Sequence, residues 1–409
     1  MALPLAGFTV VELASWVMGP TAGGVLAEWG ADVIKVEPPA TGDPVRHLRH
    51  RSAVDTSVPL NVNLHHANRS KRSIGIDVAT DAGHALLMRL VERGDVFLTN
   101  YLPAVRAKLR VDVADVQAVN PRMIYARSTA LGPRGPENHR AGYDYATFWC
   151  RTGIADALFT SELSYPPVMA SGGMGDMTTG AVLAGAISAA LLKRERTGEA
   201  SVVDVSLLAT GAWMMGLNVA AAAGGHPLRL HSQADRDRPA NPLVNIFRTK
   251  DDRFLALCLL QTDWAWPELC DRIGRPDLAA DTRFSTHDGL MAHSSLVTAA
   301  LDDVFRTATL TEWQTRLHNT RGVWETVQDL SEVAADGQML ANGYLQALPG
   351  HESVPGAPTH LVSAPAQFDE TAGPIAPAPE LGQHTEELLL ELGCAWDDIV
   401  ELKEAQVIT

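Results

Sequence analysis

Short β-branched runs alternate with helix-length segments over about the first 130 residues, and this alternation constrains the fold more than any other feature. Strands separated by helices of this length form βαβ units, whose strands run parallel and whose connections are right-handed. The expected strands lie at residues 8–14, 32–37, 73–77, 95–100, 123–129 and, further along, 201–207. The sequence therefore predicts an α/β fold with a Rossmann-like parallel sheet.

The carboxyl ends of three of these strands indicate where a ligand binds. Ligands of open parallel sheets bind beyond the carboxyl ends of the strands. Residues Ala14–Val17, Glu37–Pro38 and Asn100–Tyr101 are therefore expected near a cleft. No Gly-x-Gly-x-x-Gly sequence follows the first strand, which argues against a dinucleotide-dependent dehydrogenase.

The length of the chain predicts two domains. Its 409 residues exceed the roughly 250–300 residues at which a single hydrophobic core stops growing. We expect a large Rossmann-like domain from 1–205 and 335–409, linkers at 206–224 and 326–334, and a small α+β domain at 225–325. Within the small domain, a β-hairpin is expected at 243–260, and helices near 262–274, 289–306 and 309–319.

Three other stretches carry structural expectations. Residues 205–225 are rich in Gly and Ala and predict one helix that is buried in protein on most sides. Residues 226–242 predict a polar loop, and residues 350–380, which are rich in proline, predict an extended segment.

Charge and cysteine content exclude several classes of function. The formal net charge of −15 argues against binding to nucleic acid or to anionic membranes, because both require a basic surface. The four cysteines are scattered without a Cys-x-x-Cys pair, so neither a metal site nor a disulfide framework is expected. No basic segment precedes an apolar core at the N-terminus, and we expect a cytoplasmic protein with no membrane partner.

The stretch "SGGMGDMTTGAVLAG" (171–185) contains a single charged residue, Asp176. Aspartate is among the best helix N-cap residues, and from the residues alone a cap is the favoured interpretation. A carboxylate among glycines can also be approached closely by a substrate, and carboxylates act as covalent nucleophiles. Backbone N–H groups of Gly172, Gly173 and Gly175 could then face a developing oxyanion. In either role the helix dipole is expected to keep Asp176 ionised.

An ordered series of motifs favours the second interpretation. The series comprises "VVELASWVMGPTAGGVLAEWGADVIKVEPPATGDPVR", "NRSKRSIGID", "DVFLTNYLP", "NPRMIYARSTALGPRGP", "GYDYAT", "GGMGDMTTGAVLAGAISAALLKRERTGEASVVDVSLL" and "LGQHTEELLLELG". It resembles the family III CoA-transferases, which include the formyl-CoA:oxalate, carnitine and bile-acid CoA-transferases and their relative α-methylacyl-CoA racemase. The resemblance extends from residue 5 to about residue 400.

The resemblance implies a mechanism and an assembly. By position, Asp176 is the family's catalytic aspartate, which attacks the acyl-CoA thioester to give an acyl–aspartyl anhydride and then an aspartyl-CoA thioester. A coenzyme A thioester is the substrate, a carboxylic acid is the acceptor, and no metal or prosthetic group is required. Members of the family form interlocked homodimers.

Two departures concern the type of reaction. Racemases of the family have a histidine base where this chain has Tyr143, and a glutamate near Gln261. Tyrosine is a poor base near neutral pH, so these departures favour a transferase over a racemase. A non-catalytic acyl-CoA-binding protein remains the third possibility.

The resemblance also suggests residues that contact the substrate. Formyl-CoA transferase has a glutamine where this chain has Val17, and apolar Trp16 and Met18 flank that position. These apolar residues suggest a larger, apolar acyl group. Phe148 and Trp149 either line the same site or pack in the core. Residues Gly173, Gly175 and Tyr143 complete the expected acyl site. The expected CoA contacts are Glu37, Pro38, Lys71, Arg72, Asn100, Tyr101, Arg106, Lys108 and Leu109.

Overall fold

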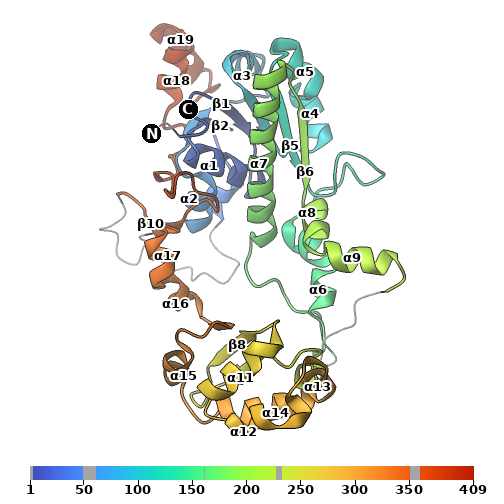
Figure 1. Cartoon of the computed structure of the whole chain (residues 1–409). Coiled ribbons are helices and arrows are strands. Elements are labelled where there is room, and N and C mark those ends of the chain that lie inside the picture. Colours follow the sequence, from blue (N-terminus) through green and yellow to red (C-terminus); the bar gives the residue numbers. More distant parts are fainter. Residues whose placement is uncertain (1–2, 49–60, 161, 227–232, 351–359) are drawn as a thin grey trace. The chain divides into compact units, whose positions relative to one another are not determined.

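The computed structural model describes residues 3–48, 61–160, 162–226, 233–350 and 360–409, which fold into two compact units (Figure 1). The first unit comprises Met1–Asp156, Val168–Leu228 and Asp336–Thr409, and the second Ala157–Pro167 and Arg229–Ala335. The roles assigned to the domains from the sequence, and the linkers between them, stay predictions.

A six-stranded parallel sheet forms the centre of the first unit. Its strands are β1 (Thr9–Leu13), β2 (Asp32–Glu37), β3 (Arg72–Gly75), β4 (Val96–Thr99), β5 (Ile124–Thr129) and β6 (Val202–Ser206). Their order is β3-β2-β1-β4-β5-β6, and every neighbouring pair is parallel. All six strands expected from the sequence are therefore confirmed, because each is a β-branched run between helices.

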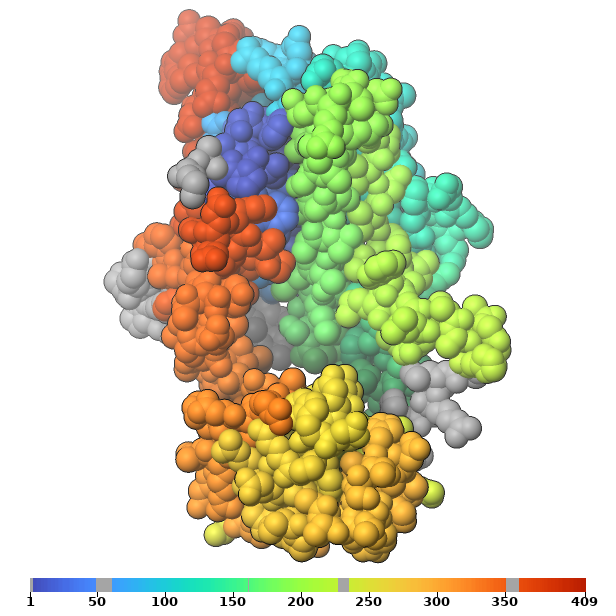
Figure 2. All heavy atoms as spheres, viewed as in Figure 1, coloured from blue at the N-terminus to red at the C-terminus, as the bar shows by residue number. Residues whose placement is uncertain are grey.

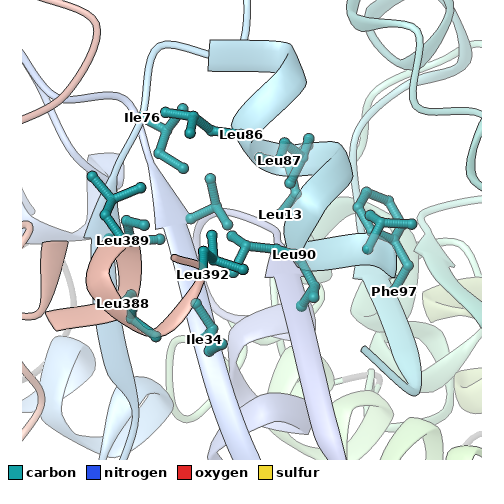
Figure 3. Packing of buried hydrophobic residues seen from close by; sticks show 14 of the residues in the cluster. Leu13, Ile34, Ile76, Leu86, Leu87, Leu90, Phe97, Leu388, Leu389 and Leu392 are labelled. Atoms are coloured by element: carbon teal, nitrogen blue, oxygen red, sulfur yellow. The ribbon is translucent and has the colours of Figure 1, made fainter. Parts of the chain in front are cut away.

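Helices cover both faces of this sheet. On one face, α3 (Asp81–Arg93), α5 (Val113–Val119), α18 (Thr385–Glu391) and α19 (Trp396–Glu404) contribute to one apolar cluster. Figure 3 shows Leu388, Leu389 and Leu392 packed toward Leu90 and Ile34 in that cluster. The C-terminal helices thus complete a core that the N-terminal strands begin.

On the other face, α1 (Met18–Glu28) packs against the long helix α7 (Met174–Thr197). Every residue of α1 is buried. A glycine allows the close approach, since a Cβ at Gly180 would lie 2.7 Å from the Thr21 Cβ and 2.8 Å from the Met18 carbonyl oxygen. The start of α7 is therefore held beside the loop that follows β1.

The second unit has its own core. Its antiparallel sheet has the order β7 (Val244–Arg248), β8 (Phe254–Cys258), β9 (Val323–Thr326), so the predicted hairpin is confirmed. Its helices are α10 (Gln233–Asp237), α11 (Thr262–Arg272), α12 (Pro276–Ala280), α13 (His287–Ala292), α14 (Ser294–Phe305), α15 (Leu310–Leu317) and α16 (Leu330–Ala334). The prediction of a loop over 226–242 is wrong for α10, whose Arg236 guanidinium donates to the Ile246 carbonyl of the edge strand β7. Residues 227–232 lie outside the described residues.

The remaining elements are short. They are α2 (Val62–Asn68), α4 (Pro103–Leu109), the π-helical turn η2 (Tyr145–Cys150), α6 (Ile154–Ala157), α17 (Gly337–Ala341), β10 (Leu345–Ala347), β11 (His360–Val362) and the 3-10 turns η1 (Pro44–His47) and η3 (Thr282–Phe284). The predicted extended segment at 350–380 contains β11 and lies partly outside the described residues.

The Gly/Ala-rich stretch differs from its prediction. It forms two helices, α8 (Leu207–Met214) and α9 (Gly216–Ala223), and α9 has no buried residue. Trp213 and Leu217 are 85% and 89% exposed. Figure 2 shows the atoms of this segment, in yellow-green, at the surface of the first unit. The expectation of one buried helix is therefore wrong for the single chain, because apolar composition indicates burial without indicating which chain provides it.

One described helix, α7, is long and apolar enough to cross a bilayer by length and composition alone. Core helices of folded proteins pass the same test, and α7 packs on the sheet through Leu183 and Ile187, so this is weak evidence for a membrane span.

Candidate active site

Asp176 lies in the first turn of α7. The helix begins after Gly173, which is the N-cap residue and has left-handed backbone angles (φ 82°, ψ 0°) that favour glycine. Asp176 is the third helical residue, so the prediction that it caps the helix is wrong. No described residue forms a hydrogen bond or an ion pair with its carboxylate, which leaves both oxygens available to a ligand.

The pKa of Asp176 departs from the expectation that the dipole keeps it ionised. Burial and the negative charge of Asp144 raise the pKa of Asp176 to about 7. Both effects disfavour the carboxylate form and together outweigh the helix N-terminus. A carboxylate with a raised pKa is a stronger base and a stronger nucleophile once it is ionised.

Asp144 is a neighbour that the sequence interpretation did not single out. Its side chain is buried, and its Oδ1 accepts a hydrogen bond from the Tyr145 N–H at 2.8 Å. Burial raises the pKa of Asp144, although the N–H groups of Tyr145 and of the first turn of α7 oppose the shift. Its Oδ2 is buried with no hydrogen-bond partner among the described residues. The only sequence signal was its place next to Tyr143 in "AGYDYAT".

A cavity of about 350 Å³ opens in front of Asp176. Its walls come from the loop after β1, the start of α4, the end of β5, the segment 138–143 and Asp176 itself. Of the predicted site residues, the cavity is lined by Trp16, Met18, Asn100, Tyr101, Tyr143 and Asp176. The Trp16 and Tyr143 rings meet edge to face with centroids 5.7 Å apart, so an aromatic pair forms one wall.

Three other predicted acyl-site residues, Val17, Gly173 and Gly175, do not line this cavity. Val17 is the residue before α1, and its Cγ1 would lie 3.7 Å from a Cβ at Gly173. A Cβ at Gly175 would lie 2.5 Å from the Phe148 ring, so glycine is required there by packing. Phe148 is fully buried and Trp149 nearly so, and neither lines the cavity. The oxyanion role of the two glycines stays a prediction.

Two of the predicted CoA contacts, Asn100 and Tyr101, line the cavity. Asn100 also fixes the loop after β1, because its Oδ1 accepts from the Ser15 N–H at 3.0 Å and its Nδ2 donates to the Ser15 carbonyl at 2.7 Å. Arg106 is buried and donates to the Tyr101 carbonyl at 2.7 Å. Lys108 is exposed on α4.

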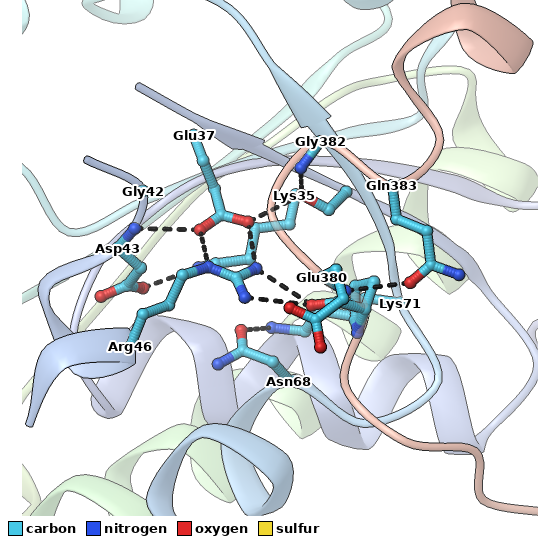
Figure 4. A network of polar contacts seen from close by, with 12 residues as sticks. Lys35, Glu37, Gly42, Asp43, Arg46, Asn68, Lys71, Glu380, Gly382 and Gln383 are labelled. Atoms are coloured by element: carbon cyan, nitrogen blue, oxygen red, sulfur yellow. Dashed lines mark hydrogen bonds and ion pairs between the residues drawn. The ribbon is translucent and has the colours of Figure 1, made fainter. Parts of the chain in front are cut away.

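The other predicted CoA contacts do not line this cavity. Glu37 and Lys71 are buried. Glu37 binds Arg46 in the network of Figure 4, and Lys71 binds Glu12. Arg72 pairs with Asp32, Glu387 and Glu391, Leu109 packs against the core, and Pro38 is exposed. Their contacts with CoA stay predictions, and those of Lys71 and Arg72 would have to compete with the existing ion pairs.

The described residues contain no group of three or more His, Cys, Asp or Glu side chains that could hold a metal ion.

Comparisons with known proteins show the family to which the chain belongs. A sequence profile of CoA-transferase family III matches residues 5–385. The chain belongs to CoA-transferase family III. The transferase is 29% identical over 405 residues to (R)-2-hydroxy-4-methylpentanoate CoA-transferase of Clostridioides difficile, with 99% of each chain covered. It is 28% identical to cinnamoyl-CoA:phenyllactate CoA-transferase of Clostridium sporogenes, with 98% of this chain and 96% of the relative covered.

A solved structure extends the similarity to the fold. The crystal structure of a CAIB/BAIF family protein from Brucella suis matches the transferase with a TM-score of 0.80 at 27% identity, covering 96% of this chain and all of that one. The transferase is thus an enzyme that acts on CoA thioesters, while the relatives differ in the acids that they use.

Proposed function

We propose that the transferase moves CoA from an acyl-CoA donor to a carboxylic acid acceptor through covalent intermediates on Asp176. The observation that carries this proposal is the carboxylate of Asp176, which faces the cavity from the first turn of α7 with no described side-chain partner. An unpaired carboxylate of raised pKa has the availability and the basicity that a nucleophile needs.

The proposed reaction has two halves. The Asp176 carboxylate attacks the thioester carbonyl, the C–S bond breaks, and CoA leaves as a thiolate, which gives an acyl–aspartyl anhydride. The thiolate then attacks the aspartyl carbonyl and releases the donor acid, which leaves an aspartyl-CoA thioester. The acceptor carboxylate reverses these steps and restores Asp176, so no net proton is taken up or released. The N–H groups at the start of α7, which also act on Asp144, would stabilise the oxyanions.

The walls of the cavity support a preference for apolar acyl groups. Trp16, Met18 and Tyr143 form part of its surface. The two curated relatives act, by name, on a branched hydroxy acid and on aromatic acids. We propose that this chain takes a branched or aromatic acyl group of medium to large size.

The reaction class is tested by incubating a 2-methylacyl-CoA with the enzyme in heavy water, with and without an acceptor acid. The proposal predicts an acceptor-dependent appearance of a new acyl-CoA and no deuterium at the α-carbon. Rapid α-deuterium uptake without acceptor would instead identify a racemase. Tight CoA binding without either reaction would identify a binding protein.

We further propose that a second copy of the chain covers α8 and α9 in an interlocked homodimer. The support is the exposed apolar surface of these helices, where Trp213 and Leu217 have no covering residue in the described chain. Sedimentation of the wild type and of a Trp213→Ser/Leu217→Ser variant tests this, since the substitutions should weaken a dimer and leave a monomer unchanged.

A further inference from the structure

A buried ionic network lies under the loop that follows β1, and the proposed mechanism makes no use of it. Lys35, on β2, is fully buried, and its Nζ donates to Glu12 Oε1 at 3.1 Å, to the Ala14 carbonyl at 3.0 Å and to Asp43 Oδ2 at 2.8 Å. Burial lowers the pKa of Lys35, but the charges of Asp43, Glu12 and Glu37 raise it more strongly, so the lysine stays charged. Figure 4 shows Lys35, Glu37 and Asp43 in this network.

Asp43 connects this network to the cavity. Its side chain is buried, and its Oδ1 accepts hydrogen bonds from the Trp16 N–H and the Val45 N–H, both at 2.9 Å. Its own N–H donates to Glu37 Oε2 at 2.9 Å. One carboxylate oxygen therefore holds Trp16 while the other is held by Lys35.

Trp16 requires such an anchor. Its φ is 67°, in the left-handed region that a bulky side chain disfavours, and such residues persist only when their surroundings enforce the conformation. Asn100 fixes the preceding residue, Ser15, through both of its backbone groups. The Trp16 N–H is left for Asp43, and the conformation directs the indole ring against Tyr143.

We propose that Asp43, held by Lys35, is a positioning residue that fixes Trp16 against Tyr143 and thereby determines which acyl groups the cavity accepts. The proposal rests on the proposed function in that the cavity is taken to receive the acyl group. A carboxylate suits the task because it accepts two N–H bonds and a lysine bond without needing to donate. The selectivity of the cavity thus depends on a residue that does not line it.

The test measures binding of two unreactive CoA thioethers, S-benzyl-CoA and S-methyl-CoA, by titration calorimetry. Their affinity ratio reports selectivity without any covalent step. Trp16→Ala should lower the benzyl preference about tenfold. Asp43→Ala should lower it similarly, and the double variant should lower it no further, because both substitutions remove the same wall. Asp43→Asn, which keeps an acceptor oxygen, should give an intermediate ratio.

Glu28→Gln is the matched control. It breaks an equally buried ion pair of the same unit, with Arg69, at 2.8 Å, which does not touch the loop. It should lower stability and leave the affinity ratio unchanged.

An unchanged ratio in Asp43→Ala, or effects that multiply in the double variant, would overturn the proposal. Should Asp43→Ala not fold, an unchanged ratio in Asp43→Asn would have the same consequence. A wild type that binds neither thioether would overturn it together with the proposed function, whereas binding without transfer activity would overturn only the covalent mechanism.

Discussion

Two groups of carboxylates in the first unit differ in whether a cation faces them. Glu12 and Asp43 each lie within 2.8 Å of a buried lysine ammonium. Asp144 and Asp176 have no ion-pair partner among the described residues. Burial raises the pKa of both carboxyls, and the charge of Asp144 raises that of Asp176 further. Buried carboxylates that pair with a cation fix the structure around them, whereas unpaired ones are available to react with a ligand. The fold places both kinds beside the loop that follows β1.

The largest expected effect follows from removing the unpaired carboxylate at the cavity. Asp176→Ala should reduce CoA transfer by at least about a thousandfold, because the substitution removes the nucleophile and leaves only binding. The rate of CoA release from an acyl-CoA donor measures the loss. Asp156→Ala, at an exposed position on α6, serves as control and should keep full activity.

Removing a carboxylate from the paired group should lower the stability of the protein. In the wild type the buried Lys71 ammonium lies 2.7 Å from the Glu12 carboxylate. Glu12→Gln removes this counter-charge from a buried position. We expect a loss of about 3 kcal/mol in the free energy of unfolding, measured by urea denaturation. Glu387→Gln breaks an exposed pair with Arg72 and should cost less than about 1 kcal/mol. Equal losses in the two variants would remove the distinction between buried and exposed pairs.

The fold and the site were predictable from the sequence to different extents. The six strands were predictable because β-branched runs between helices have a local signature. Asp176 was found through its motif, but its position inside the first turn was not, because Gly173 takes the cap. Contacts between residues that lie far apart in the sequence could not be predicted, and nothing in the sequence places Asp144 beside α7.

Burial of charge was equally hidden. Lys71 is expected from the sequence to contact CoA, yet its side chain is fully buried against Glu12. The partner stands 59 residues away, so only the sheet brings the two together. The exposure of the apolar helices α8 and α9 was also not predicted, because their composition says nothing about which chain covers them.

The charge of Asp144 should determine the pH range of activity. Because that charge raises the pKa of Asp176, Asp144→Asn should move the acidic limb of the kcat/KM profile from about pH 7 to lower pH. Asp156→Ala again gives the reference profile. An unshifted limb would show that Asp144 does not act on Asp176.

A smaller effect concerns stability against pH. The raised pKa means that folded Asp176 binds a proton between about pH 4 and pH 7 where the unfolded chain does not, so its contribution to stability falls as the pH rises through this window. Asp176→Asn removes this dependence. The free energy of unfolding of the variant, relative to that of the wild type, should therefore be higher at pH 8 than at pH 5. Denaturant midpoints at both pH values measure this difference. A constant difference would contradict the raised pKa.

The most direct test of the central claim is to trap the intermediate. The wild type is incubated with an acyl-CoA donor and hydroxylamine, digested, and mapped by mass spectrometry. The account predicts a hydroxamate on Asp176, absent from Asp176→Ala and unchanged in Asp156→Ala. A modification at another carboxylate, or CoA transfer to an acceptor acid with no hydroxamate on Asp176, would contradict it.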